Sequence, residues 1–114
     1  MKAMIYESGI LSATNTDVMS AGRLNSIPFN GILTIDVISQ LADATNFYTM
    51  SIQMPDGEVP VESQLVPGSN PALAGVLDER QLARFSFPVR QGGHVVLSLT
   101  ESGTAVCTYR LVLR

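Results

Sequence analysis

Few residue types in this sequence could carry out chemistry, and none of them forms a recognisable catalytic arrangement. His94 is the one histidine of the chain and Cys107 the one cysteine. A single histidine cannot build a multi-histidine metal site, and first-row transition metals need several such ligands. No Gly-x-Ser-x-Gly motif supplies a nucleophile for a triad with His94. We therefore expect a protein that is not an enzyme, with no catalytic residues, no cofactor and no transition metal.

Carboxylates gather in two parts of the sequence. Asp56, Glu58 and Glu62 surround one predicted hairpin, and Asp78 and Glu79 lie in a long loop. Calcium takes six or more oxygen ligands, usually several from one closely spaced loop, and no Asp-x-Asp-x-Asp series occurs here. Solvated acidic patches are the simpler interpretation. A weak calcium site is the alternative that the sequence leaves open.

The composition excludes several classes of protein. The chain has 114 residues, of which 46% are hydrophobic and 15% charged, and its net charge is −3. It is long enough for one domain and too apolar for a disordered tail. No apolar run approaches the roughly 18 residues of a membrane span, and an acidic chain is a poor match for nucleic acid. We expect neither a membrane nor a nucleic acid as a partner.

Alternating apolar and polar residues predict β-strands along most of the chain. The last third shows this most clearly, with strands predicted over 82–90, 95–99 and 105–113. The loops between them, 91–93 and 101–103, each have three residues and end in glycine. A three-residue loop whose last residue is a left-handed glycine is a common β-hairpin connection.

The apolar residues of these three strands agree in phase. With those loop lengths Val89 faces Val95, Phe87 faces Leu97, and Leu97 faces Cys107. Every inward residue then meets another, whereas a slip of one residue would turn all of them to the opposite face. The sequence therefore predicts a C-terminal three-stranded meander, in which Cys107 is a buried and unreactive thiol.

Further strands are predicted earlier in the chain, two of them clear and two weaker: 33–37 and 48–53, then 1–6 and 18–24. A two-residue turn at Asp56-Gly57 would place Ile52 opposite Val61 and Tyr48 opposite Leu65. Together the segments predict an all-β fold, a single antiparallel β-sandwich of about seven to nine strands.

The predicted domain spans residues 1–114 and has two unusual segments. Residues 1–12 are too apolar for a free tail, and residues 67–81 carry two prolines and two glycines without a period. We interpret the first as an extended arm and the second as a long surface loop that mediates contacts. The arm could dock on a partner or form an edge strand of the protein's own sheet, and the sequence leaves both alternatives open.

The outward face of the predicted meander mixes arginine with apolar side chains. Such mixtures are favoured at protein interfaces, although an imperfectly polar face of a small sandwich would look the same. In that register His94 lies opposite Arg90 and Arg110, whose charges would disfavour its protonated form. The candidate interface residues come from this face, the arm and the long loop: Met4, Tyr6, Ile10, Leu11, Leu73, Arg84, Arg90, His94 and Arg110.

The whole chain resembles one family in character. A short acidic β-sandwich with an extended arm, scarce lysine, a loop interrupted by proline and glycine, and a strand-dense C-terminus resembles the small cement (decoration) proteins of tailed-phage heads. The stretches that carry the resemblance are MSIQMPDG at 50–57 and QGGHVVLSLTESGT at 91–104. The resemblance implies a protein made in the host cytoplasm that self-associates as a dimer or trimer. It would then bind a major capsid protein on the outside of the virion.

A small ligand-binding or carbohydrate-binding β-sandwich module is the alternative. Sugar-binding sandwiches usually show exposed Trp or clustered Tyr for stacking on sugar rings. This chain has no Trp, and its aromatic residues make up 6%. Phe85, Phe87, Tyr48 and Tyr109 are all predicted to point inward. The sequence therefore favours the assembly function over the ligand-binding one.

Overall fold

Seven β-strands make up all the regular secondary structure in the part of the chain that the computed structural model describes, residues 3–40, 45–68 and 82–114. Their bounds are β1 Ile5–Leu11, β2 Gly31–Ser39, β3 Phe47–Gln53, β4 Val61–Leu65, β5 Ala83–Val89, β6 Val96–Ser102 and β7 Cys107–Leu113. The predicted all-β fold is confirmed.

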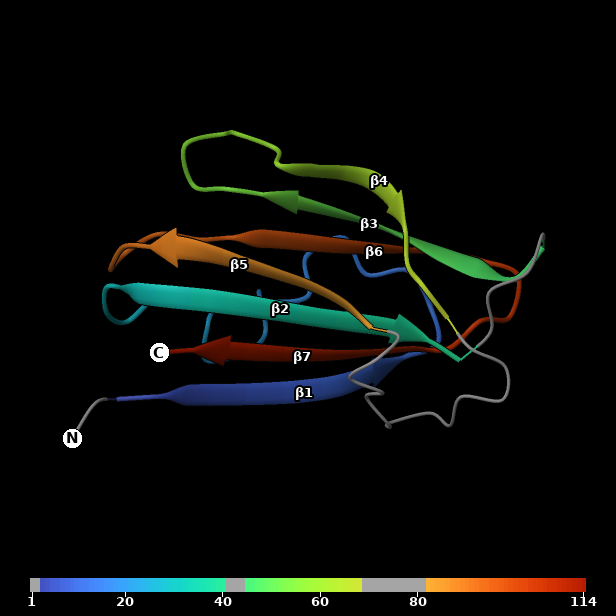
Figure 1. The fold of residues 1–114 in the computed structure, drawn as a ribbon, viewed down its shortest axis with the longest axis horizontal. Helices are drawn as coiled ribbons and strands as arrows, with labels where there is room; N and C mark the ends of the chain where they lie inside the picture. Colours follow the sequence, from blue (N-terminus) through green and yellow to red (C-terminus); the bar gives the residue numbers. More distant parts are fainter. Residues whose placement is uncertain (1–2, 41–44, 69–81) are drawn as a thin grey trace.

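The strands form two sheets, one of four strands in the order β1-β7-β2-β5 and one of three in the order β4-β3-β6. Every pairing within them is antiparallel. Figure 1 shows the seven strands running nearly parallel to the long axis, with the β3–β4 hairpin at one side and β1 at the other. Residues 12–30, which we call the 12–30 connection, join β1 to β2.

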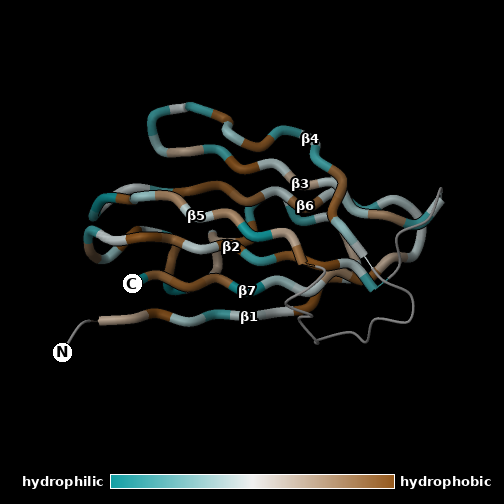
Figure 2. The backbone as a smooth tube through the Cα atoms, viewed as in Figure 1, coloured by the Kyte–Doolittle hydropathy of each residue, from teal (hydrophilic) through white to brown (hydrophobic). Residues whose placement is uncertain are grey.

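The core lies between the inner faces of the two sheets. Alternate residues of β2, such as Leu33, Ile35 and Val37, and alternate residues of β3 and β6 are buried in a single hydrophobic cluster. Figure 2 shows hydrophobic stretches along β2, β6 and β7, and hydrophilic ones at the tip of the β3–β4 hairpin. The predicted inward aromatics also contact this core: Tyr48 is fully buried, and Phe85, Phe87 and Tyr109 pack against it partly buried.

The predicted C-terminal meander is wrong in its pairing. β5 pairs with β2, β6 pairs with β3, and β7 lies between β1 and β2, so the three consecutive strands alternate between sheets. The expected pairs Val89–Val95, Phe87–Leu97 and Leu97–Cys107 are therefore not strand neighbours. Their inward orientation is nonetheless correct, because all five residues contact the same core. Because both sheets face the same core, a strand shows the same alternation of apolar residues in either sheet. The alternation therefore cannot distinguish a hairpin within one sheet from a crossover between the two.

The predicted arm is a strand of the protein's own sheet. Residues Ile5–Leu11 pair along their whole length with Cys107–Leu113 of β7. This is the edge-strand alternative that the sequence left open. The predicted strand over 18–24 is wrong: those residues form turns within the 12–30 connection, which buries Val18, Met19, Leu24 and Ile27 in the core. Most of the predicted loop at 67–81, including Leu73, lies outside the described residues.

Candidate functional site

The outer face of the four-stranded sheet carries large apolar side chains in solvent. Four of the six exposed large hydrophobic residues in the described part of the chain lie on it, Met4, Tyr6, Ile10 and Ile32, with exposed fractions of 46% to 60%. Their positions follow from the alternation of each strand, because Ile5 and Leu11 of β1 and Leu33 of β2 point to the core. We call this surface the outer face.

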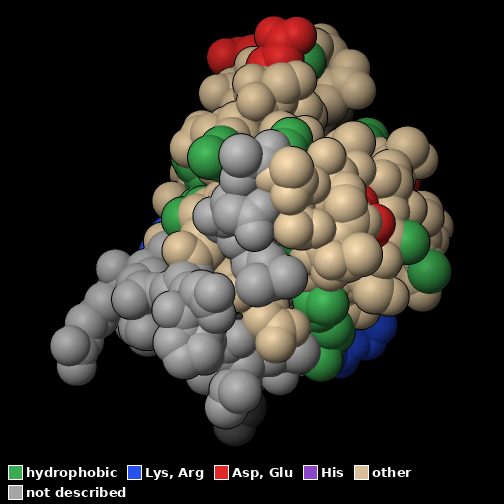
Figure 3. Space-filling model, turned by 90° about the vertical axis from the view of Figure 1, so that its right-hand side faces the viewer, with side chains coloured by type: hydrophobic (Ala, Val, Ile, Leu, Met, Phe, Trp, Pro, Cys, Tyr) green, Lys and Arg blue, Asp and Glu red, His purple; other side chains and the backbone are tan. Residues whose placement is uncertain are grey.

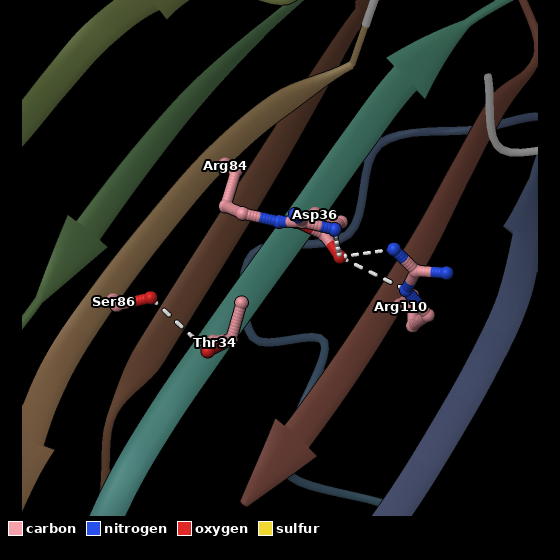
Figure 4. A network of polar contacts seen from close by, with 5 residues as sticks. All are labelled: Thr34, Asp36, Arg84, Ser86 and Arg110. Carbon is pink, nitrogen blue, oxygen red and sulfur yellow. Dashed lines mark hydrogen bonds and ion pairs between the residues drawn. The ribbon is translucent and has the colours of Figure 1, made fainter. Parts of the chain in front are cut away.

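A charged network occupies the middle of the outer face. Asp36 of β2 pairs with Arg84 of β5 on one side and Arg110 of β7 on the other. Arg84 donates from Nε to Oδ1 of Asp36 at 2.7 Å and from Nη2 to Oδ2 at 3.2 Å. Arg110 donates to Oδ2 from Nε at 2.9 Å and from Nη2 at 2.7 Å. Figure 4 shows the two guanidinium groups approaching the carboxylate from neighbouring strands.

The environment of Asp36 keeps its carboxylate charged. The side chain is only 1% exposed, and burial alone would raise its pKa. Hydrogen bonds from Arg84 and Arg110, together with their positive charges, outweigh burial, so the pKa of Asp36 is lowered below 3.8. A fixed carboxylate between two arginines gives the surface a defined polar centre rather than a catalytic acid or base.

A shallow depression of about 400 Å³ runs over this network. Its floor contains Asp36 and the hydroxyl pair of Thr34 and Ser86, whose oxygens lie 3.0 Å apart (Figure 4). Met4, which precedes β1, and Tyr6 of β1 also line it. The depression is thus a polar centre with an apolar border on one side, which is the composition of a protein-binding surface more than of a buried substrate site.

The structure brings together five of the predicted interface residues on the outer face and places Leu11, Arg90 and His94 elsewhere. Met4, Tyr6, Ile10, Arg84 and Arg110 share that face. Leu11 instead points inward and packs on the core.

Arg90 and His94 lie at the corner that joins β5 to β6, and the expected position of His94 opposite Arg90 and Arg110 is wrong. The His94 ring instead contacts Asp17 and Asn25 of the 12–30 connection. Its pKa is raised, chiefly by the hydrogen bond to Asp17 and then by that to the Asn25 carbonyl. The prediction failed because it paired β5, β6 and β7 within one sheet.

Sequence reasoning missed Asp36 and Ile32 as residues of this surface. A signal was available for Asp36, because it is the one charged residue in the otherwise uncharged segment 31–39. Charged residues are rarely buried without a partner, so the aspartate itself implied basic residues on the adjacent strands. No comparable signal marks Ile32, whose exposure depends on which strands cover the sheet.

A second hollow lies between the tip of the β3–β4 hairpin and the β5–β6 corner. Its volume is about 600 Å³, and apolar residues such as Met54, Pro60, Phe87 and Val89 line much of it. Asp56, Glu58 and Arg90 supply charges at its wall. Figure 3, which looks along the strands, shows acidic side chains gathered at the top of the molecule, on the side of this hairpin.

Among residues 3–40, 45–68 and 82–114 no group of three or more His, Cys, Asp or Glu side chains is placed to hold a metal ion. Cys107 is buried, and this burial raises the pKa of its thiol to about 12, which keeps it protonated. The same described residues contain no helix long and apolar enough to cross a membrane.

Comparison with known proteins gives likenesses of structure only. No protein-family model and no curated protein sequence matches the chain. The SPBc2 prophage-derived protein YomS is similar, with a TM-score of 0.45 and 10% identity over 100% of this chain and 97% of that one. A chain of the acidic stable capsid structure of Helicobacter pylori bacteriophage KHP30 is similar with a TM-score of 0.43 and 13% identity, over 99% and 92% of the two chains.

The xylan-binding CBM22-1 domain of Paenibacillus barcinonensis Xyn10C is also similar, with a TM-score of 0.35 and 11% identity over 96% of this chain and 85% of that one. These similar chains include two of phage or prophage origin and one carbohydrate-binding domain. At these TM-scores and identities the likenesses assign no activity and no partner to this chain.

Proposed function

We propose that this protein is a non-enzymatic structural protein that docks through its outer face onto a larger protein assembly. The assembly that fits the resemblance in sequence is a phage capsid, whose outside the protein would decorate and stabilise. The observation that carries the proposal is the gathering of exposed Met4, Tyr6, Ile10 and Ile32 around the Asp36 network. Such an apolar patch with a polar centre marks an interaction site on a soluble protein.

The residue types on the outer face suit an interface. Tyr and Arg are the side chains that most often dominate binding energy, and here Tyr6 lies beside Arg84 and Arg110 at the depression. The Asp36 carboxylate already fixes both guanidinium groups in the free protein. A surface that is ordered before binding loses less conformational entropy when a partner covers it.

The edge strands of both sheets are protected against pairing with a strand of another protein, which favours docking through the outer face. Exposed edges invite pairing with other strands unless they are protected. On the edge strand β1, the guanidinium of Arg23 donates a hydrogen bond to the Tyr6 carbonyl oxygen at 2.7 Å. On the edge strand β5, Pro88 has no N–H to donate to an added strand. β4 has five residues and an irregularity at Ser63, whose φ is 48°. The 12–30 connection covers β6 through two hydrogen bonds between Asn15 and Leu99, of 2.9 and 2.8 Å.

The test compares capsids made from the genome that encodes this chain, with the wild-type gene and with variants. Ile32→Ser combined with Tyr6→Ser removes apolar area from the outer face without touching the core. Leu65→Ser, at a somewhat more exposed position on β4, is the control. We expect the double variant to fold but to be lost from purified particles, measured by mass spectrometry of their protein content, while Leu65→Ser is incorporated normally. Normal incorporation of the double variant would contradict the proposal.

The hollow beside the β3–β4 hairpin favours ligand binding as a second candidate function. Its volume of about 600 Å³ falls within the usual range of small-molecule sites, roughly 300–1,000 Å³. Titration calorimetry with xylan oligosaccharides on wild type and on Met54→Ala, which opens the hollow, distinguishes the candidates. Saturable binding of an oligosaccharide, with an affinity that Met54→Ala changes, would support a ligand-binding module. If the wild-type protein showed such binding and was also absent from purified particles, ligand binding would replace docking as the proposed function.

A further inference from the structure

The ring of His94 connects two parts of the chain in a way that requires a proton on each of its nitrogens. Nε2 lies 2.8 Å from Oδ2 of Asp17, and Nδ1 contacts the carbonyl oxygen of Asn25. A carboxylate and a carbonyl only accept hydrogen bonds, so a neutral imidazole, with one N–H, can satisfy only one of them. We propose that protonated His94 is a pH-sensitive latch that holds the 12–30 connection against the β5–β6 corner.

The segment under the latch is a structural cover of the molecule. Val18, Met19, Leu24 and Ile27 of the connection are buried in the core. Next to the latch, Ile27 donates its N–H to the Gly93 carbonyl at 2.8 Å and accepts from the Gly92 N–H at 2.7 Å. Release of the connection would therefore expose apolar core.

Release would also uncover the outer edge of β6. Val18 donates its N–H to the Leu97 carbonyl at 2.9 Å, and Asn15 exchanges hydrogen bonds with Leu99. Between Asp17 and Asn25 the connection is also tied to β1, where Arg23 donates to Glu7 and to the Tyr6 carbonyl. The latch at His94 and the tie at Arg23 thus hold the same stretch of the cover to two different parts of the molecule, and only the first contains a group that titrates near neutral pH.

The charges around the ring favour its protonated form. Asp17 is the charged group that acts on His94, and within the described residues its Oδ1 is buried without a hydrogen-bond partner. The corner itself carries Arg90, and the hairpin tip that packs Pro55 close to Gly93 carries Asp56 and Glu58. Hydrogen bonding to Asp17 and Asn25 outweighs the opposing effect of burial, so the pKa of His94 is raised above 6.5.

The sign of the pH effect follows from that direction. A histidine whose folded-state pKa is raised contributes stability below its unfolded pKa and loses this contribution as pH rises through the folded-state value. The latch therefore holds the connection more strongly below the pKa of His94 than above it. Deprotonation leaves the Asp17 carboxylate or the Asn25 carbonyl without a donor from the ring.

Because the chain has a single histidine, the titration can be measured directly. The carbon and nitrogen chemical shifts of the His94 ring, recorded by NMR from pH 5 to 9 on the full chain, give its pKa. We expect a value above 6.5 in wild type and a decrease toward 6.5 in Asp17→Asn. Glu62→Gln, which removes an exposed carboxylate on β4, is the control and should leave the His94 pKa unchanged. A wild-type pKa at or below 6.5 would overturn the proposal.

Hydrogen exchange measures the opening itself. We expect the amides of residues 14–27 to lose protection, after correction for intrinsic rates, as pH rises through the measured His94 pKa, by about tenfold per unit of pKa shift. Strands β2 and β3 should not show this change. In His94→Gln the loss should be present at every pH. Protection of residues 14–27 that is the same at pH 5.5 and 8.5 in wild type would overturn the proposal, even if His94→Gln failed to fold.

Discussion

At the scale of single residues, Asp36 has the strongest influence on the outer face. A buried carboxylate that accepts four hydrogen bonds from two arginines is stable because both of its oxygens are satisfied. Its value for binding is indirect: it positions Arg84 and Arg110 and keeps the centre of the face polar. The sequence contained this aspartate and both arginines, but only the strand order placed them side by side.

Substitution of Asp36 tests that network. Asp36→Asn removes the negative charge while keeping the shape, and we expect it to lower the free energy of unfolding by about 1.5–3 kcal/mol at pH 7, the range for hydrogen bonds to charged groups. Arg84→Gln should cost about 0.2–1 kcal/mol, because half of the Arg84 side chain is exposed to solvent. Urea unfolding measures both changes, and equal costs for the two variants would contradict this assignment.

The same substitution predicts a change with pH. The lowered pKa of Asp36 means that its contribution is present above its ordinary pKa of 3.8 and is lost as pH falls through the folded-state value. The stability difference between wild type and Asp36→Asn should therefore shrink below pH 4. A difference that stays constant from pH 7 to pH 2.5 would show that the carboxylate charge does not stabilise the fold.

At the scale of elements, local patterns predicted strands well and their partners poorly. Alternation placed 48–53 and the three C-terminal segments correctly, and the pair Ile52–Val61 is confirmed. The pair Tyr48–Leu65 is wrong, because the irregularity near Ser63 moves Leu65 opposite Thr49. A bulge changes register without changing the apolar pattern that precedes it.

The loops between β5, β6 and β7 likewise did not reveal that these strands alternate between the two sheets. In the loop at 91–93 the left-handed residue is Gly92, with φ of 87°, rather than the predicted Gly93, and Pro55 packs close to Gly93. In the second loop Gly103 is left-handed as predicted, with φ of 75°. The connections in the structure span residues 90–95 and 103–106, longer than the predicted three residues, and both cross between the sheets. Only the long-range pairing with β2 and β3 reveals this.

Deletion of β1 tests whether that strand stabilises the fold in addition to contributing to the docking surface. Ile5 and Leu11 pack on the core, and the Tyr109 ring lies so close to Gly9 that a Cβ there would meet its hydroxyl oxygen. We expect a chain lacking residues 1–11 to lose about 2–4 kcal/mol of stability, from the partial burial of those side chains, with a lower Tm in thermal unfolding. An unchanged Tm with lost docking would mean that β1 acts only as an arm.

At the scale of the whole molecule, the exposed apolar residues of the outer face lie apart from one group of acidic side chains. The outer face holds Ile32 and Tyr6, whereas this acidic group lies at the top of the molecule, on the side of the β3–β4 hairpin (Figure 3). Of the six exposed large hydrophobic residues in the described part of the chain, four lie on the outer face, and a two-fold pair could cover both copies of it. Self-association of the free protein would then compete with capsid docking for the same surface.

Light scattering of the purified chain tests that association. We expect the mass to rise above the monomer value of 12.2 kDa with increasing concentration, because burial of apolar area on the outer face is favourable by roughly 25 cal/mol per Å² before ordering costs. Ile32→Glu places a charge in that contact and should hold the protein at the monomer mass. Leu65→Glu, at a somewhat more exposed position on the other sheet, should associate as wild type does. An oligomer that persists in Ile32→Glu would place self-association on another surface and leave the outer face for the capsid alone.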